Sequence, residues 1–380
     1  MNRHGANGQG LHGKRPDRDA VPGEGQRAKD RGPAGDGRAG SVGRRLGRGR
    51  RGEQPMVPEA EFTSYYGKPV LKPPVWEARD IAGYFFLGGL AGGSSLLAAG
   101  ADLTGRPGLS RAAKTGALGA IGLSLVALVH DLGRPARFIN MMRVLKVTSP
   151  MSVGTWLLSG YAPAAGVAAA TALTGRLPRL GTVATTGAAV LGPAVAAYTA
   201  ALVADTAVPA WHDGYREMPF VFTGSGAMAA GGLGLLAAPS GESGPARNLA
   251  LAGQVMEMLA FERMTRRMGM VAEPYHTGRG GGYVRAGQVL GALGATGAAL
   301  SGTPAVPAGR ARRIVAAASG AALMGASIAT RWGVFHAGLA SARDPRYTVV
   351  PQRQRLNERE SAKVKPPSSP PEQLPVVPPA

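Results

Sequence analysis

Eight long apolar stretches, separated by short loops rich in Gly, Pro and Arg, occupy the chain between residues 81 and 339. Most of them reach the roughly 17–25 residues that an α-helix needs to cross about 30 Å of hydrocarbon. We therefore predict an all-α integral membrane protein, an eight-transmembrane-helix bundle with disordered termini. The predicted spans are 81–101, 115–129, 152–174, 182–208, 220–238, 246–261, 284–302 and 314–339.

The composition of these stretches argues against a water-soluble bundle. Only 17% of the residues are charged, whereas a soluble domain carries about 25%. Between Gly83 and Gly100 the only polar side chains are Tyr84 and two serines. Gly and Ala are poor choices for a soluble helix surface, but in a bilayer they let helices approach closely. The overlapping GxxxG steps of the first span, at residues 88, 89, 92 and 93, are therefore predicted to be packing residues.

The chain contains no cysteine. This excludes disulfides, thiolate metal sites, cysteine-held iron–sulfur clusters and a cysteine nucleophile.

The formal charge of +20 lies mostly outside the apolar stretches. Residues 1–55 hold 13 Lys/Arg and 14 Gly and almost no large apolar residue, so they cannot bury enough surface to fold. We predict a disordered basic tail there, the alternative being a nucleic-acid-binding arm. A membrane-proximal segment at 56–80, the helix bundle at 81–340 and a C-terminal tail at 341–380 with a Pro-rich end complete the predicted organisation.

An even number of spans puts both termini on one side of the membrane. When the tail residues nearest the membrane are counted, this side carries 16 Lys/Arg against nine on the other. Because cytoplasmic loops carry an excess of Lys and Arg, we predict a multi-pass protein of the cell (inner) membrane with cytoplasmic termini.

Polar residues within the spans are few, and each is a functional hypothesis because burial in lipid is costly. Glu77 and Asp80 stand at the entry of the first span, with Tyr84 one turn deeper. Tyr198 lies in the fourth span, too deep for an interfacial aromatic belt. Ordinary alternatives are an interfacial position for Tyr84 and a helix–helix hydrogen bond for Tyr198.

Two further charged residues within the spans are candidates for an ion pair, and the histidines are candidates for haem ligands. Glu257 in the sixth span pairs with Arg331 of the eighth or with another buried Arg, or it carries protons. One haem held by His130 and His336 is conceivable, but neither lies at mid-span and capping roles are favoured. We therefore predict no haem and no metal in this chain.

Several short motifs, in order along the spans, resemble the polysulfide reductase membrane-subunit family, also called NrfD-like or PsrC-like. Each motif alone is weak, and their order on eight spans makes the resemblance specific. The matching pieces are Tyr84-Phe-Phe-Leu-Gly-Gly-Leu-Ala-Gly-Gly93, Asp131-Leu-Gly-Arg-Pro-Ala-Arg137, Ser149-Pro-Met-Ser-Val-Gly154, Tyr198-Thr followed by Val208-Pro-Ala-Trp211, and Ser341-Ala-Arg-Asp-Pro-Arg-Tyr347.

The resemblance implies a membrane anchor that exchanges electrons between a partner iron–sulfur subunit and the quinone pool. The implied partners are a ferredoxin-like 4Fe-4S subunit and a molybdopterin catalytic subunit on the side bearing the termini, together with membrane lipid and no nucleic acid. The implied cofactor is menaquinone or ubiquinone. Trp76-Glu-Ala-Arg-Asp80 resembles members that accompany formate dehydrogenases. The alternatives are a secondary transporter, a haem-containing cytochrome b-type anchor and an anchor without a quinone site.

Quinone chemistry needs hydrogen-bond donors for the carbonyl oxygens and a route for protons. The resemblance points to Tyr198 first and Tyr84 second as the carbonyl partners. Asp80, Glu77 or His130 are predicted to relay protons, because burial shifts such groups toward neutral pH.

The loop 130–151 mixes basic and apolar side chains, which suits a protein interface. Asp131, Arg134, Arg137 and Arg143 are the predicted contacts with the partner subunit. A segment lying on lipid headgroups, or an Asp131–Arg134 pair that shapes the loop, are the alternatives.

Overall fold

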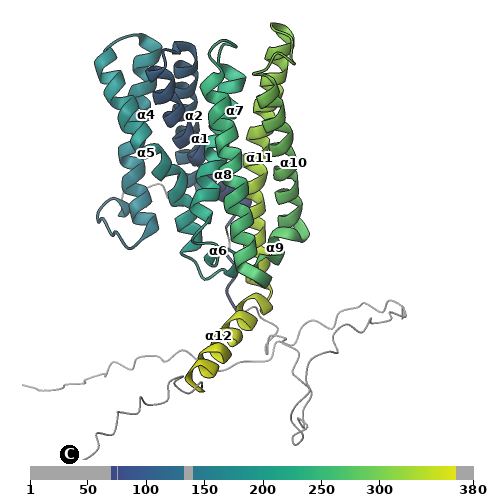
Figure 1. Ribbon diagram of the computed structural model, residues 1–380. Helices are drawn as coiled ribbons and strands as arrows, with labels where there is room; N and C mark the ends of the chain where they lie inside the picture. The colour runs from purple at the N-terminus through teal and green to yellow at the C-terminus, as the bar shows by residue number, and fades with distance from the viewer. Residues whose placement is uncertain (1–69, 75, 132–139, 365–380) are drawn as a thin grey trace, which may run out of the picture. The chain divides into compact units, whose positions relative to one another are not determined.

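The computed structural model describes residues 70–74, 76–131 and 140–364, and its regular structure within these ranges is entirely helical. Every apolar stretch of the sequence analysis coincides with one long helix (Figure 1). The eight long helices are α1 (Ala78–Leu103), α2 (Pro107–Asp131), α4 (Pro150–Thr174), α5 (Pro178–Ala204), α7 (Met218–Ala237), α8 (Gly244–Met268), α10 (Gly278–Leu300) and α11 (Arg310–Arg343).

Proline and glycine set several helix ends. Pro150 and Pro178 are the first residues of α4 and α5, where the missing N–H has no intrahelical partner to lose. Gly175 ends α4 with a φ of +68°, a backbone conformation that costs glycine little. Pro163 and Pro193 lie inside α4 and α5, and both helices nevertheless run on as continuous elements.

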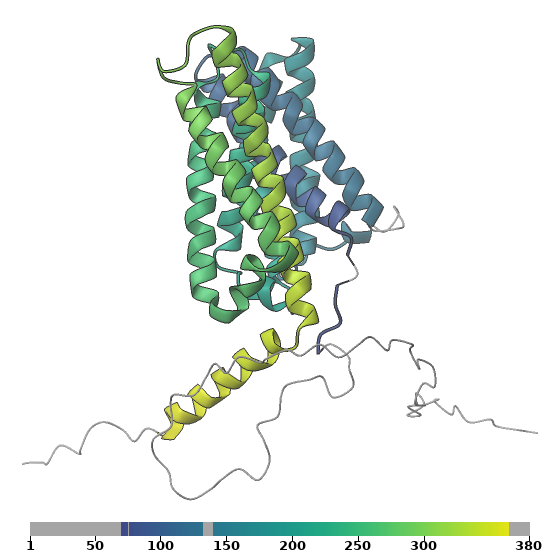
Figure 2. The ribbon, with the colours of Figure 1, turned by 90° about the vertical axis from the view of Figure 1, so that its right-hand side faces the viewer.

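The long helices form two groups of four. Helices α1, α2, α4 and α5 pack together, as do α7, α8, α10 and α11, and α1 joins the groups by packing against α7 and α11. Figure 2 shows the bundle from the side on which α10 and α11 lie next to each other.

Hydrogen bonds near the helix ends identify the two ends of the bundle. At one end, the Glu242 carboxylate accepts from Leu109 N at 2.8 Å, and Arg313 donates to Ala238 O at 2.6 Å. At the other end α6 (Pro209–His212) meets α9 (Glu273–His276), which follows the 3-10 turn η1 (Gly269–Ala272). There the Tyr275 hydroxyl donates to Ala210 O at 2.8 Å. We call this second end, where α1 begins and α11 ends, the terminal end.

Glycines allow α1 to approach α7 and α5 closely. A Cβ on Gly93 would lie 2.6 Å from Gly226 O of α7, and a Cβ on Gly192 of α5 would lie 2.5 Å from Gly92 O. Backbones pack directly at both crossings, which confirms the packing role predicted for Gly92 and Gly93.

Six of the eight long helices are long and apolar enough to cross a membrane: α1, α2, α4, α5, α7 and α11. Helices α8 and α10 do not meet that measure within the described residues. By length and composition the chain therefore has six candidate membrane spans, and the predicted count of eight spans is not confirmed.

The region after α11 contains a further helix that the sequence analysis does not anticipate, α12 (Arg346–Val364). Its first residue, Arg346, contacts the Glu273 carboxylate at 3.0 Å and the Asp344 carboxylate at 2.7 Å. The basic tail predicted at 1–55 and the Pro-rich C-terminal end lie outside the described residues.

Candidate functional site

A small cavity opens between α1, α2, α4 and α5, and its wall includes both Tyr84 and Tyr198. Tyr84 stands six residues after the start of α1, and Tyr198 six residues before the end of α5. At 1.5 Å per residue, both lie about 9 Å inside the terminal end. The structure thus brings together two predicted site residues that are more than a hundred positions apart in the sequence.

The rest of the cavity wall is mostly apolar, with Asp131 as its charged member. Asp131 is the last residue of α2 and is solvent-exposed. The sequence analysis assigns it to partner docking, but it also contributes to the tyrosine cavity. The remaining wall residues are Trp76, Ile81, Leu128, Met141, Met151, Gly154, Thr155, Leu158 and Leu202.

Gly154 determines where the Tyr198 ring lies. A Cβ built on Gly154 would be 2.5 Å from Tyr198 Cδ2 and closer still to Cε2. Carbon atoms in contact are about 3.5–4.0 Å apart, so any larger residue would displace the ring. Gly154 belongs to a motif that the sequence analysis recognised. The sequence analysis did not predict that Gly154 leaves the space in which the Tyr198 ring lies.

The cavity has a volume of about 90 Å³, the share of about three water molecules in the liquid. Pockets that bury a whole small molecule span about 300–1,000 Å³. The wall carries two phenol side chains, whose hydroxyls can donate hydrogen bonds to carbonyl oxygens of a planar ring. Admission of such a ring requires side chains of the wall to move outward.

The predicted proton-relay residues lie beside the cavity. His130 Nδ1 and Asp80 Oδ2 are 2.9 Å apart and join the end of α2 to the start of α1. The Asp80 side chain is 17% exposed and the His130 side chain 75%, so the pair links the protein to water. Glu77 is exposed and precedes α1. Among the described residues, the cavity wall includes Asp131 but none of these three.

The predicted docking residues are only partly visible. Arg143 is exposed in the loop before α4. Arg134 and Arg137 lie outside the described residues. Their contact with a partner subunit stays a prediction.

Arg331 and Glu257 are buried in the second group of helices, but they do not form the direct ion pair that the sequence analysis considered. Arg331 of α11 is fully buried and donates to Phe85 O at 2.9 Å, Phe222 O at 2.8 Å and Ser225 Oγ at 2.5 Å. These bonds tie α1, α7 and α11 together. The Glu257 carboxylate instead accepts from the Thr330 hydroxyl at 2.5 Å.

The histidines considered for haem ligation have separate partners. His130 pairs with Asp80 of α1, whereas His336 stacks on Tyr283 of α10 with ring centroids 5.3 Å apart. Within the ranges that the structure describes, no group of three or more His, Cys, Asp or Glu residues is placed to hold a metal ion. That the chain carries no haem stays a prediction.

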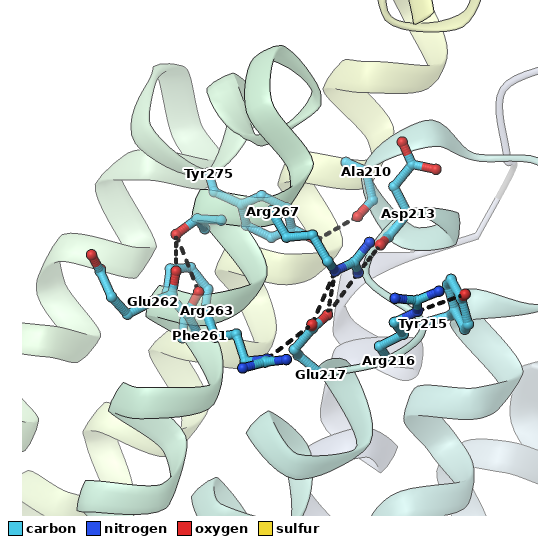
Figure 3. A network of polar contacts seen from close by, with 11 residues as sticks. Ala210, Asp213, Tyr215, Arg216, Glu217, Phe261, Glu262, Arg263, Arg267 and Tyr275 are labelled. Carbon is cyan, nitrogen blue, oxygen red and sulfur yellow. Dashed lines mark hydrogen bonds and ion pairs between the residues drawn. The ribbon is translucent and has the colours of Figure 1, made fainter. Parts of the chain in front are cut away.

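A polar network that the sequence analysis missed fastens the terminal end (Figure 3). Glu217, only 4% exposed, accepts from Arg267 Nε at 2.9 Å and from Nη2 at 2.6 Å. Arg267 also donates to Asp213 O, and Arg263 lies 3.6 Å from the Glu217 carboxylate. The hydrogen bonds from Arg267 lower the pKa of Glu217, and this effect outweighs burial, which raises it. The network joins the end of α8 to the loop before α7.

The fold and the cavity define a class before any comparison: an all-helical membrane protein with two tyrosines in a cavity near one end of the bundle. The chain belongs to the NrfD family, since the family model described as "Polysulphide reductase, NrfD" matches residues 71–340. No curated protein sequence matches the chain.

Membership fixes the general role of the chain. NrfD proteins are quinone-interacting membrane subunits of molybdoenzyme complexes, in which they partner with iron–sulfur and molybdopterin subunits. The family match agrees with the resemblance noted from the sequence motifs. It does not extend to the formate dehydrogenase subtype.

Proposed function

We propose that this chain anchors a molybdenum- or tungsten-enzyme complex to the cell membrane and passes electrons between the complex and membrane quinone at the cavity of Tyr84 and Tyr198. The observation that carries the proposal is that the two tyrosines share one cavity about 9 Å inside the terminal end. A ring held there lies close to a partner bound at that end, which keeps the electron-transfer distance short.

The quinone supplies two-electron, two-proton chemistry, and the residues of this chain position it and carry protons. The Tyr198 and Tyr84 hydroxyls donate hydrogen bonds to the two carbonyl oxygens. Asp131, at the cavity wall, exchanges a proton with the adjacent His130, and the Asp80–His130 pair passes it to water. Glu77 adds a carboxylate at the same exposed end. The apolar wall excludes water from the ring.

A matched pair of tyrosine variants tests this assignment. Y198F in the purified complex should reduce quinone-linked turnover by about 10²-fold or more, as when a preorganised donor is lost. The control is Y161F, because Tyr161 is also buried but bonds Ser95 Oγ at 2.7 Å, away from the cavity. If Y198F and Y161F keep equal quinone turnover, Tyr198 is not part of the site.

We also propose that α8 and α10 cross the membrane, which makes eight spans. The polar residue Glu257 faces the interior, and the outward side of α8 exposes Val255 and Leu259. Mean hydropathy combines the inner and outer sides of a helix, so it does not reveal this arrangement. The Tyr275–Ala210 hydrogen bond supports the proposal, because it returns the chain to the terminal end after α8.

The absence of cysteine makes this topology directly testable. Single T277C and S240C variants, both at exposed positions, are treated with a membrane-impermeant maleimide in intact and permeabilised cells. With cytoplasmic termini, S240C should react in intact cells and T277C only after permeabilisation. Equal labelling of both sites would mean that α8 does not cross, and the reverse pattern would place the termini outside.

The partner is proposed to be a formate dehydrogenase-like enzyme, on the resemblance of Trp76-Glu-Ala-Arg-Asp80 alone. The complex purified through this chain should then reduce menaquinone or ubiquinone analogues with formate as electron donor. A complex that turns over quinone but not formate would refute the formate link and leave the quinone proposal intact.

A further inference from the structure

A large groove runs along the outer surface of α7 and α8, apart from the tyrosine cavity. Its volume is about 870 Å³. On α8 its lining extends from Leu251 to Arg263, a length of about 18 Å at 1.5 Å per residue. This is comparable to the length of one extended acyl chain.

The walls of the groove are apolar and exposed. Phe220 of α7 is 59% exposed, and Val255 and Leu259 of α8 are 49% and 61% exposed. Contiguous apolar surface of this kind is unfavourable in water. In a bilayer it faces hydrocarbon, so the walls suit an acyl chain.

The groove ends in two arginines at the terminal end. Figure 3 shows the guanidinium groups of Arg216 and Arg263 on either side of the Glu217 carboxylate. The Arg263 side chain is 80% exposed and lies 3.6 Å from Glu217, and Arg216 Nε donates to the Tyr215 hydroxyl at 2.8 Å. Both retain further N–H groups for a ligand.

Neighbouring acidic groups do not cancel this positive charge. Both oxygens of Glu217 already accept hydrogen bonds from Arg267, and Glu262 pairs with Arg266 at 2.6 Å. The groove mouth, formed by Arg216 and Arg263, therefore carries excess positive charge. Arg263 is five residues before the end of α8, about 8 Å along the axis, a depth that suits the headgroup region.

We propose that this groove binds one anionic phospholipid, with its phosphate held by the free N–H groups of Arg216 and Arg263 and an acyl chain along Val255 and Leu259. Arginine guanidinium groups match phosphate oxygens in pairs, and basic pockets beside membrane helices bind acidic headgroups. A zwitterionic lipid brings an ammonium group to the same arginines and binds less well. The bound lipid covers the α7–α8 seam directly below the Glu217–Arg267 network.

Lipid retention by the full chain tests the proposal. The detergent-purified protein is delipidated and titrated with phosphatidylglycerol or phosphatidylcholine, and bound lipid is counted by native mass spectrometry. We expect one tightly held phosphatidylglycerol per chain. R216Q/R263Q should weaken its binding by roughly tenfold or more, while R279Q/R343Q, which changes two exposed arginines outside the groove, should not.

A second variant keeps the test decisive if the double arginine variant fails to fold. V255W fills the exposed groove and retains both arginines, so it should also lose the tightly bound lipid. Equal retention of phosphatidylcholine and phosphatidylglycerol by the wild-type protein would overturn the proposal. So would unchanged binding in V255W, or a partner helix or quinone found in the groove instead.

Discussion

Replacing Gly154 by alanine tests the geometry of the tyrosine cavity with a single methyl group. The new Cβ would lie 2.5 Å from Tyr198 Cδ2, whereas carbon contacts are about 3.5–4.0 Å. The ring must therefore move by about 1 Å. Overpacking of this kind costs about 1–3 kcal/mol, and misplacing a positioning group by 1 Å reduces turnover by about 10²-fold.

The matched control is G160A on the same helix. Its Cβ would meet Leu191 Cδ1 at 3.5 Å, an ordinary contact. Both substitutions gain about 1 kcal/mol of helix propensity, so the difference between the variants isolates the clash. We expect G154A to fall about 1–3 kcal/mol below G160A in the free energy of unfolding and to lose quinone turnover.

A double-mutant cycle completes the test. In a Y198A background the ring is gone, so G154A should no longer destabilise the protein relative to G160A. If G154A has the same cost with and without the ring, or if G154A and G160A turn over quinone equally, the reasoning that Gly154 seats Tyr198 is wrong.

Two further predictions concern the buried charges. The pKa of Glu217 is lowered in the folded protein by Arg267, so the stability it contributes is complete above the unfolded pKa of about 4.3 and is lost as the pH falls through the lower folded pKa. Thermal unfolding of E217Q should therefore depend less on pH in this acid range than that of the wild type, and equal pH dependence would refute the assignment. R331M removes the donors of two backbone carbonyls and Ser225, and should lower the free energy of unfolding by about 3 kcal/mol or more. The control is R343M, which changes an exposed arginine of the same helix. Both variants are unfolded by denaturant in detergent, and equal unfolding midpoints would contradict the bridging role of Arg331.

The sequence predicts the helices well because each element is defined by local signals. Eight apolar runs of helical length, with prolines such as Pro150 and Pro178 at their starts, mark all eight long helices of the structure. Helix α12 was missed because most of its residues are polar. Ion pairs such as Arg355 with Asp213 at 3.6 Å tie it to the rest of the chain. Such a helix has no apolar periodicity from which it could be predicted.

The site was only partly predictable, for a reason that lies in the spans themselves. Tyr84 and Tyr198 stand out because they are polar residues in apolar helices and match the family motifs. The contact of Gly154 with Tyr198 depends on how α4 and α5 are rotated against each other. A helix that is apolar on all sides carries no pattern that fixes this rotation. The Glu217–Arg267 bond likewise joins residues 50 positions apart on different elements.

Helix α8 shows how average hydropathy misleads when a membrane helix is polar on its inner side. Glu257 is 8% exposed, while Met258 and Leu259, its immediate neighbours, are 55% and 61% exposed. In water the opposite arrangement would be favourable, because charged side chains belong outside and large apolar ones inside. A helix that buries its carboxylate against Thr330 and presents aliphatic side chains outward is suited to lipid. The direction in which its side chains point, rather than their mean hydropathy, therefore argues that α8 lies in the membrane.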